Sequence, residues 1–172
     1  TITSIFGFCD VRNFTDTTEC LQEEVMLFVN RIAHILHSII VQCNGSANKN
    51  IGDAFLLTWK IETNCSAYDK QRLADQALLS FCKTHIELCK HQNFICNFSV
   101  DATQRLFKRF PDYKVKIGTG LHVGWAVEGA IGSDLKIDAT YLSPNVNMAE
   151  FLEGSTKQYG VALLISSPFY LL

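Results

Sequence analysis

The chain has 172 residues, which is the length of one domain with a sizeable core. Its 15 basic and 17 acidic side chains give a formal net charge of −2, which argues against the strongly basic surface of a nucleic-acid-binding protein. No uninterrupted apolar run reaches about 18 residues, so we expect no membrane contact by this domain itself. Any nucleotide that it binds is therefore expected to be small.

The seven cysteines form an odd set without a C-x-x-C pair. This pattern favours free thiols over a disulfide framework or a zinc site. We therefore expect a cytoplasmic domain, and the parent protein remains free to be attached to a membrane.

The first part of the chain predicts a strand followed by a long helix. Residues 1–10 are apolar and β-prone, and several cap-forming residues follow them. From Leu21 the apolar residues recur in alternating steps of four and three, which is the spacing of one helical face. The sequence therefore predicts a helix that continues to about Cys43, where Asn44-Gly45 breaks it.

The elements after this helix predict an α+β domain. We expect strands at 45–52 and 53–61 joined by a tight turn at Ile51-Gly52-Asp53, then a helix at 70–91 and an insertion at 93–112 with at most one short helix. Two glycine-punctuated strands follow at 113–124 and 125–132. The chain then continues with a helix at 144–152 that begins with proline, a strand at 161–165 and a last helix at 166–172. The order βαββαβ is typical of a ferredoxin-like antiparallel sheet with helices on one face.

Two aspartates occupy positions that could form one site. Asp10 ends the first strand, and Asp53 lies at the tip of the predicted hairpin. If their strands are neighbours, both carboxylates project from one edge of the sheet, and a few carboxylate oxygens are what Mg²⁺ prefers. The N–H groups of residues 11–15 open the following helix and would attract phosphate oxygens. Each aspartate taken alone also fits a cap or a turn.

Four segments, in order along the chain, resemble the class III nucleotidyl cyclases. FGFCDVRNFT is similar to the F-x-D-I-x-x-F-T signature of that family, and NKNIGDAFLLTW to its K-x-x-G-D segment. KIGTGLHVGWAVEGAIGS resembles the I-G-x-G-L-H-x-G…G-x-I-G stretch, and LKIDATYLSPNVNMAEFLE the base-recognition strand with the helix after it. The resemblance covers nearly the whole chain, is of the adenylyl type, and is similar to cyclase domains of protists such as alveolates. It implies the class III cyclase fold.

The resemblance also implies an activity and roles for individual residues. ATP would be converted to 3′,5′-cyclic AMP and pyrophosphate at a dimer interface, with two Mg²⁺ or Mn²⁺ ions per active site. Asp10 and Asp53 match the metal-binding aspartates, and the Val11 carbonyl is a further metal ligand. The other matched positions bind substrate: Asn13, Phe14 and Thr15 at the phosphates, Lys136 and Thr140 at the adenine, and Asn147 at the ribose.

One position departs from the family pattern. Four residues after the ribose-binding asparagine the family usually has an arginine, and this chain has Phe151. Losing such an electrostatic clamp costs about two or three orders of magnitude in rate. In the family, the metal aspartates come from one subunit and the other groups from its partner. We therefore expect a homodimer or, better, a heterodimer in which this domain is the metal-donating half.

Three functions compete on this evidence. The leading one is an adenylyl cyclase. The main alternative is a degenerate cyclase-fold domain that binds nucleotide or regulates a partner cyclase domain without turnover. A guanylyl cyclase is disfavoured because such enzymes usually place an acid and a small residue where Lys136 and Thr140 stand, although Lys136 also fits a solvated surface charge. We expect residues 1–172 to be a single cyclase domain that lacks its last strands, because the family's phosphate-binding lysine lies beyond Leu172.

Overall fold

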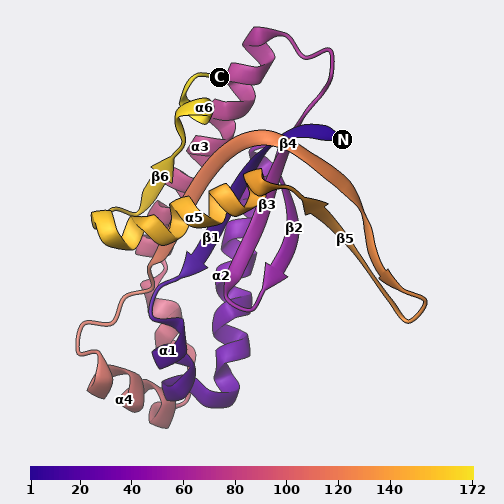
Figure 1. The fold of residues 1–172 in the computed structure, drawn as a ribbon. Helices are drawn as coiled ribbons and strands as arrows, with labels where there is room; N and C mark the ends of the chain where they lie inside the picture. Colours follow the sequence, from indigo (N-terminus) through magenta and orange to yellow (C-terminus); the bar gives the residue numbers. More distant parts are fainter.

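A sheet of six strands forms the centre of the molecule (Figure 1). The computed structural model describes residues 1–172, apart from the side chains of Phe94 and Cys96. The strands run in the spatial order β2-β3-β1-β4-β5 and pair antiparallel, while the short β6 pairs parallel with β4. Their bounds are β1 (Ile2–Val11), β2 (Ser46–Ile51), β3 (Ala54–Ile61), β4 (Ile117–Ser133), β5 (Lys136–Leu142) and β6 (Leu163–Ile165).

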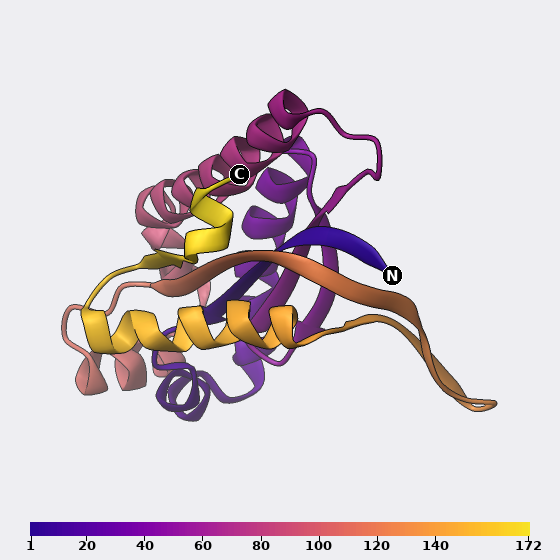
Figure 2. The same ribbon diagram turned by 45° about the horizontal axis from the view of Figure 1, so that its top comes forward.

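The helices lie on both faces of this sheet, as the views in Figures 1 and 2 show. The helix bounds are α1 (Phe14–Leu21), α2 (Val25–Gln42), α3 (Ala67–Lys90), α4 (Val100–Arg109), α5 (Pro144–Tyr159) and α6 (Ser167–Tyr170), with 3₁₀ helices at Gln22–Glu24 and Gln92–Asn97. Helices α2 and α3 cover one face, and α5 crosses the other. The expected α+β fold with an antiparallel sheet is confirmed, but the expectation that all helices cover one face is wrong for α5.

The central strand β1 explains why both faces are covered. Its residues 4–9 are all buried. Ile5 and Cys9 belong to the large core beneath α2 and α3, whereas Phe6 and Phe8 belong to a smaller cluster that includes Ala149 of α5. Because successive side chains of a strand point to opposite faces, a strand that is apolar at every position needs a cover on each side.

Helix α5 can lie close to the sheet because β4 carries glycines on that face. A Cβ on Gly120 would overlap the backbone of α5 at Ala149 and Glu153, and a Cβ on Gly124 would overlap the Asn145 side chain. These glycines lie within β4 and do not end the strand. The prediction of two separate strands at 113–124 and 125–132 is therefore wrong, since one strand runs from Ile117 to Ser133.

The helix predicted to run unbroken to Cys43 is divided in the structure. Helix α1 ends at Leu21, and Gln22 has a φ of 52°, which an α-helix cannot accommodate. The break lets α1 pack against α4, while α2 packs against α3 and the sheet. Helix α5 is also longer than predicted and ends at Gly160, whose φ of 66° is typical of a helix C-terminus.

Residues 14–42 are long and apolar enough, by length and composition alone, to span a membrane. In the fold, however, α2 packs one side against the core. Phe28, Ile32, Leu36 and Ile40 on this side are each 0% exposed. These buried residues account for one side of α2, whereas Met26, Leu27 and Val41 of the same helix are 64%, 59% and 63% exposed.

Candidate active site

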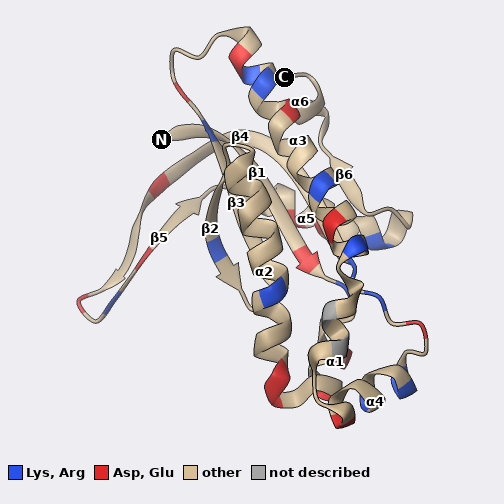
Figure 3. Ribbon diagram, turned by 180° about the vertical axis from the view of Figure 1, so that it is seen from behind, with Lys and Arg blue, Asp and Glu red and all other residues tan. Residues whose placement is uncertain are grey.

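The carboxyl groups of Asp10 and Asp53 meet at one end of the sheet. Asp10 lies one residue before the end of β1 and pairs with Ala54, the residue after Asp53. Gly52, with a φ of 63°, forms the tight turn that brings Asp53 to this place. Figure 3 shows the acidic end of β1 close to α1. The proximity expected from the sequence is thus present in the structure, whereas the role of the pair in metal binding stays a prediction.

The Asp10 carboxyl strongly influences that of Asp53. Partial burial, then a side-chain hydrogen bond with Asp10 and the negative charge of Asp10, raise the pKa of Asp53 to about 6. Two carboxylates this close repel one another. A divalent ion would relieve this repulsion.

The donor set fits Mg²⁺ or Mn²⁺. Among the side chains that the structure describes, no group of three or more His, Cys, Asp or Glu residues converges to hold a metal. Two carboxylates with the nearby Val11 carbonyl would leave most of an octahedron to water and phosphate oxygens, which is the arrangement that Mg²⁺ favours. A zinc site would instead require nitrogen or sulfur ligands.

Helix α1 begins directly beside this pair. Its N-cap residue, Asn13, has a left-handed conformation with a φ of 56°, and the Asn13 side chain makes no capping hydrogen bond. The first N–H groups of a helix, here those of Phe14 and Thr15, have no acceptor within the helix. These donors, together with the positive end of the helix dipole, favour an anion next to Asp10.

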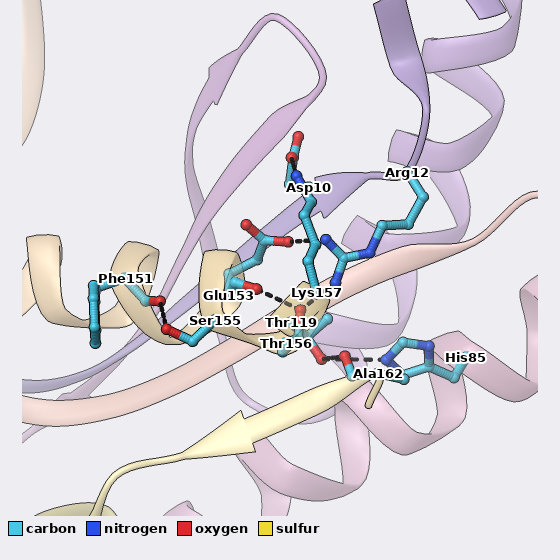
Figure 4. A network of polar contacts seen from close by, with 10 residues as sticks. All are labelled: Asp10, Arg12, His85, Thr119, Phe151, Glu153, Ser155, Thr156, Lys157 and Ala162. Carbon is cyan, nitrogen blue, oxygen red and sulfur yellow. Dashed lines mark hydrogen bonds and ion pairs between the residues drawn. The ribbon is translucent and has the colours of Figure 1, made fainter. Parts of the chain in front are cut away.

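A polar network links this end of β1 to α5 (Figure 4). Arg12 Nη1 donates to Glu153 Oε1 at 2.9 Å, and Arg12 Nη2 donates to the Thr156 hydroxyl. Lys157 Nζ lies 3.6 Å from Asp10 Oδ2. Burial and the charge of Asp10 raise the pKa of Glu153, against the opposing effect of Arg12. Our sequence reasoning missed this network because the predicted helix at 144–152 ended before Glu153 and Lys157, which stand four residues apart on α5.

The remaining predicted site residues lie away from Asp10 within one protomer. Lys136 and Thr140 are on β5, which forms with the end of β4 an arm that projects from the body of the domain (Figure 1). Lys136 Nζ lies 3.2 Å from Asp138 Oδ2. Asn147 is exposed in the first half of α5, and Figure 4 shows the Phe151 side chain directed away from Asp10. The structure therefore brings together Asp10, Val11, Asp53 and the start of α1. Lys136, Thr140, Asn147 and Phe151 lie outside that group.

Two further residues, His122 and Lys49, have positions in the structure that bear on the site. His122 is buried and hydrogen-bonds the Ser166 hydroxyl at 2.8 Å and Asn145 Oδ1 at 3.0 Å, so it connects β4 to α5 and to the start of α6. Lys49 of β2 was not considered a site residue. It pairs with Leu56, which places it on the same face of the sheet as Phe8 and Asp10. Lys49 is the lysine of the K-x-x-G-D segment, and this position in the motif could have identified it as a candidate site residue.

Comparison with known proteins identifies the family. The model of the adenylate and guanylate cyclase catalytic domain matches residues 2–167. The chain belongs to this family. An adenylate cyclase from Anabaena cylindrica is 29% identical to it over 160 residues, covering 92% of this chain and 28% of the relative. Adenylate cyclase 1 of Rhizobium meliloti (strain 1021) is 25% identical over 168 residues, covering 92% of this chain and 22% of the relative. This cyclase domain thus spans less than a third of either protein.

Solved structures agree with this assignment. A bacterial light-regulated adenylyl cyclase superposes with a TM-score of 0.77 at 28% identity, covering 99% of this chain and 44% of that one. The adenylyl cyclase CyaB from P. aeruginosa superposes with a TM-score of 0.73 at 20% identity, covering 99% and 79%. The second likeness, at lower identity, supports the fold alone. The class III cyclase fold expected from the sequence is confirmed.

Proposed function

We propose that this domain is an adenylyl cyclase, which converts ATP to 3′,5′-cyclic AMP and pyrophosphate at a dimer interface. The observation that carries the proposal is the contact between Asp10 and Asp53 beside the free N–H groups at the start of α1. Relatives named as adenylate cyclases support cyclic AMP over cyclic GMP as the product. The unpaired state of the cysteines that the structure describes agrees with a cytoplasmic location.

The residues of this chain have distinct tasks in such a reaction. Asp10, Asp53 and the Val11 carbonyl would hold two Mg²⁺ or Mn²⁺ ions, which when bound acidify the ribose 3′-hydroxyl and neutralise the triphosphate. The N–H groups of residues 13–15 would hold phosphate oxygens. The 3′-hydroxyl would lose its proton to water and its oxygen would attack the α-phosphorus in line. The bond from the α-phosphorus to the bridging oxygen would break and pyrophosphate would leave, with no covalent bond to the protein.

A second protomer would complete the site. Lys136 and Thr140 lie on the projecting arm and Asn147 lies on an exposed part of α5, so in our proposal they contact a nucleotide held by the neighbouring chain. The Lys136 ammonium would donate to the adenine N1, and the Thr140 hydroxyl would accept from the exocyclic amine. Phe151 offers no positive charge at the position where the resemblance places an arginine. A heterodimer with an arginine-bearing cyclase domain would therefore be more active than a homodimer.

The direct test replaces Asp10 with Asn and measures cyclic AMP formation with Mn²⁺. We expect the rate to fall by about a thousandfold or more, because the variant loses a ligand of both ions. Asp101→Asn is the matched control, since Asp101 is 85% exposed and pairs only with Arg105. Equal loss in both variants, or none in Asp10→Asn, would contradict the proposal. Repeating the assay with GTP tests the guanylyl alternative.

The exposed Phe151 supports one alternative, a regulatory domain that binds nucleotide or a partner cyclase without turnover. Titration of the wild-type domain with a non-hydrolysable ATP analogue separates the two functions when it is combined with the product assay. Binding without product, both alone and with an arginine-bearing cyclase domain, favours the regulatory domain.

A further inference from the structure

One side of α5 faces the strand end that carries Asp10. Glu153, Thr156 and Lys157 are three and four residues apart, a spacing that places them together on a helix. Glu153 and Thr156 both accept hydrogen bonds from the Arg12 guanidinium, and Lys157 faces Asp10 (Figure 4). The last two turns of α5 are thus joined to β1 by two ion pairs.

The Arg12–Glu153 pair is much more buried than the other ion pairs of the domain. The side chains are 17% and 5% exposed, respectively. The pair lies over Gly118 of β4, where a Cβ would overlap both charged groups. A buried ion pair is often no more stabilising than apolar residues of the same shape, so stability alone is a weak reason for its presence here.

The charges around Asp10 suggest another role for this pair. Figure 4 shows Asp10, Arg12, Glu153 and Lys157 together in one polar network. The Arg12 guanidinium is two residues from Asp10 and donates to Glu153 on α5, while Lys157 Nζ lies 3.6 Å from Asp10 Oδ2. Glu153 therefore neutralises Arg12, and Lys157 offsets only part of the negative charge of the Asp10–Asp53 pair.

We propose that Arg12 and Glu153 are positioning residues, and that Glu153 holds the Arg12 guanidinium away from the Asp10–Asp53 pair so that this pair can accept divalent cations. The proposal rests on the metal-binding role given above to Asp10 and Asp53. If Glu153 loses its charge, the carboxylates that remain for Arg12 are those of Asp10 and Asp53. Arg12 then turns toward them and competes with the metal.

The expected signature is a change in metal affinity and not in the chemical step. Glu153→Gln keeps the shape and removes the charge, and we expect Mn²⁺ to bind about tenfold more weakly because a free cation now lies close to its site. The kcat at saturating Mn²⁺ should stay close to that of the wild type. The double variant Arg12→Gln/Glu153→Gln removes the competing cation as well, so it should bind Mn²⁺ better than the single variant does.

The experiment measures binding of Mn²⁺ alone to the purified domain by electron paramagnetic resonance, with Tm recorded for every variant. Glu128→Gln is the matched control, because it breaks the 2.8 Å Lys60–Glu128 pair, which is 45% and 41% exposed and lies at the base of the arm. A purely structural role would lower Tm in Glu153→Gln and in the double variant without changing the Mn²⁺ affinity of the folded protein.

Two results would overturn the proposal, and they differ from failure of the proposed function. The role of Arg12 and Glu153 is contradicted if Glu153→Gln binds Mn²⁺ as tightly as the wild type, or if the double variant binds Mn²⁺ no better than Glu153→Gln does. In both cases Asp10→Asn would still abolish Mn²⁺ binding. Binding that survives Asp10→Asn contradicts the metal site itself. If Glu153→Gln does not fold, Arg12→Gln serves instead, and it must bind Mn²⁺ at least as tightly as the wild type.

Discussion

The two ends of the sheet differ in how much of their environment one protomer supplies. At the Asp10 end, the residues after β1 are hydrogen-bonded to α5 and covered by it. At the other end, the β4–β5 arm extends beyond the body, and Leu135 and Ile137 near its tip are 97% and 71% exposed. One protomer can therefore form the Asp10 end by itself, whereas the apolar arm has no cover of its own.

This difference indicates which functions survive in an isolated protomer. In our proposal, metal binding depends on Asp10, Asp53 and the α5 network, all within one chain. The proposed contacts to the base and the ribose depend on residues of the arm and of the exposed part of α5, and they would need a second chain. Changes at the two ends should therefore affect different measurements.

Apart from Asp10→Asn, the largest effect is expected from the arm. Changing Leu135 and Ile137 to Asp should lower cyclic AMP formation by about a hundredfold at low protein concentration, because charges replace apolar surface that a second protomer would bury. Mn²⁺ binding should stay unchanged. Analytical ultracentrifugation combined with the cyclase assay checks this, and a fully active variant that remains monomeric would contradict the need for a second chain.

A smaller gain is expected at Phe151. Phe151→Arg should raise cyclic AMP output of the isolated domain by about tenfold or more, since it restores a positive charge for the developing α-phosphate charge. Phe151→Lys is the control, because it adds the charge without the bidentate geometry of a guanidinium and should recover less. The absence of any gain with Arg would show that Phe151 does not limit the rate.

The smallest effect concerns stability and pH at the Asp10 end. Burial and Asp10 raise the pKa of Asp53 to about 6, so above that pH the Asp53 carboxylate is ionised in both states but is stabilised less in the folded, metal-free domain than in the unfolded chain. Asp53→Asn should therefore raise Tm in EDTA by about 2–4 °C at pH 8. Below about pH 4 the group is protonated in both states, and the difference should vanish.

A calorimetric scan at both pH values tests this expectation. Asp101→Asn serves as the control: it removes an exposed carboxylate that pairs with Arg105, so it should lower Tm slightly at pH 8, the opposite sign, and leave Tm unchanged below about pH 4. An Asp53→Asn variant that is less stable than the wild type at pH 8 would show that the two carboxyls do not repel one another.

Local patterns predicted most of the elements. The hairpin at Ile51-Gly52-Asp53 and the start of α5 at Pro144 follow from turn residues, and the structure contains both. The insertion at 93–112 was expected to hold at most one short helix, and it contains α4 and most of the preceding 3₁₀ helix. The break at Gln22 was not predictable in this way. Its cause is the packing of α1 against α4, a contact between segments about 85 residues apart in sequence.

The sequence by itself determined the cyclase family and the order of the strands and helices, because these depend on residues that are near one another in the chain. It identified Asp10 and Asp53 as candidates, but their proximity depends on the pairing of β1 with β3. Only the tertiary structure decided that α5 covers the second face of the sheet and that Glu153 meets Arg12, 141 residues away. The physical reason is that a charged residue is buried only where the fold brings it an oppositely charged partner, and the sequence does not show that partner. The glycines of β4 determine how closely α5, which carries Glu153, can approach the sheet.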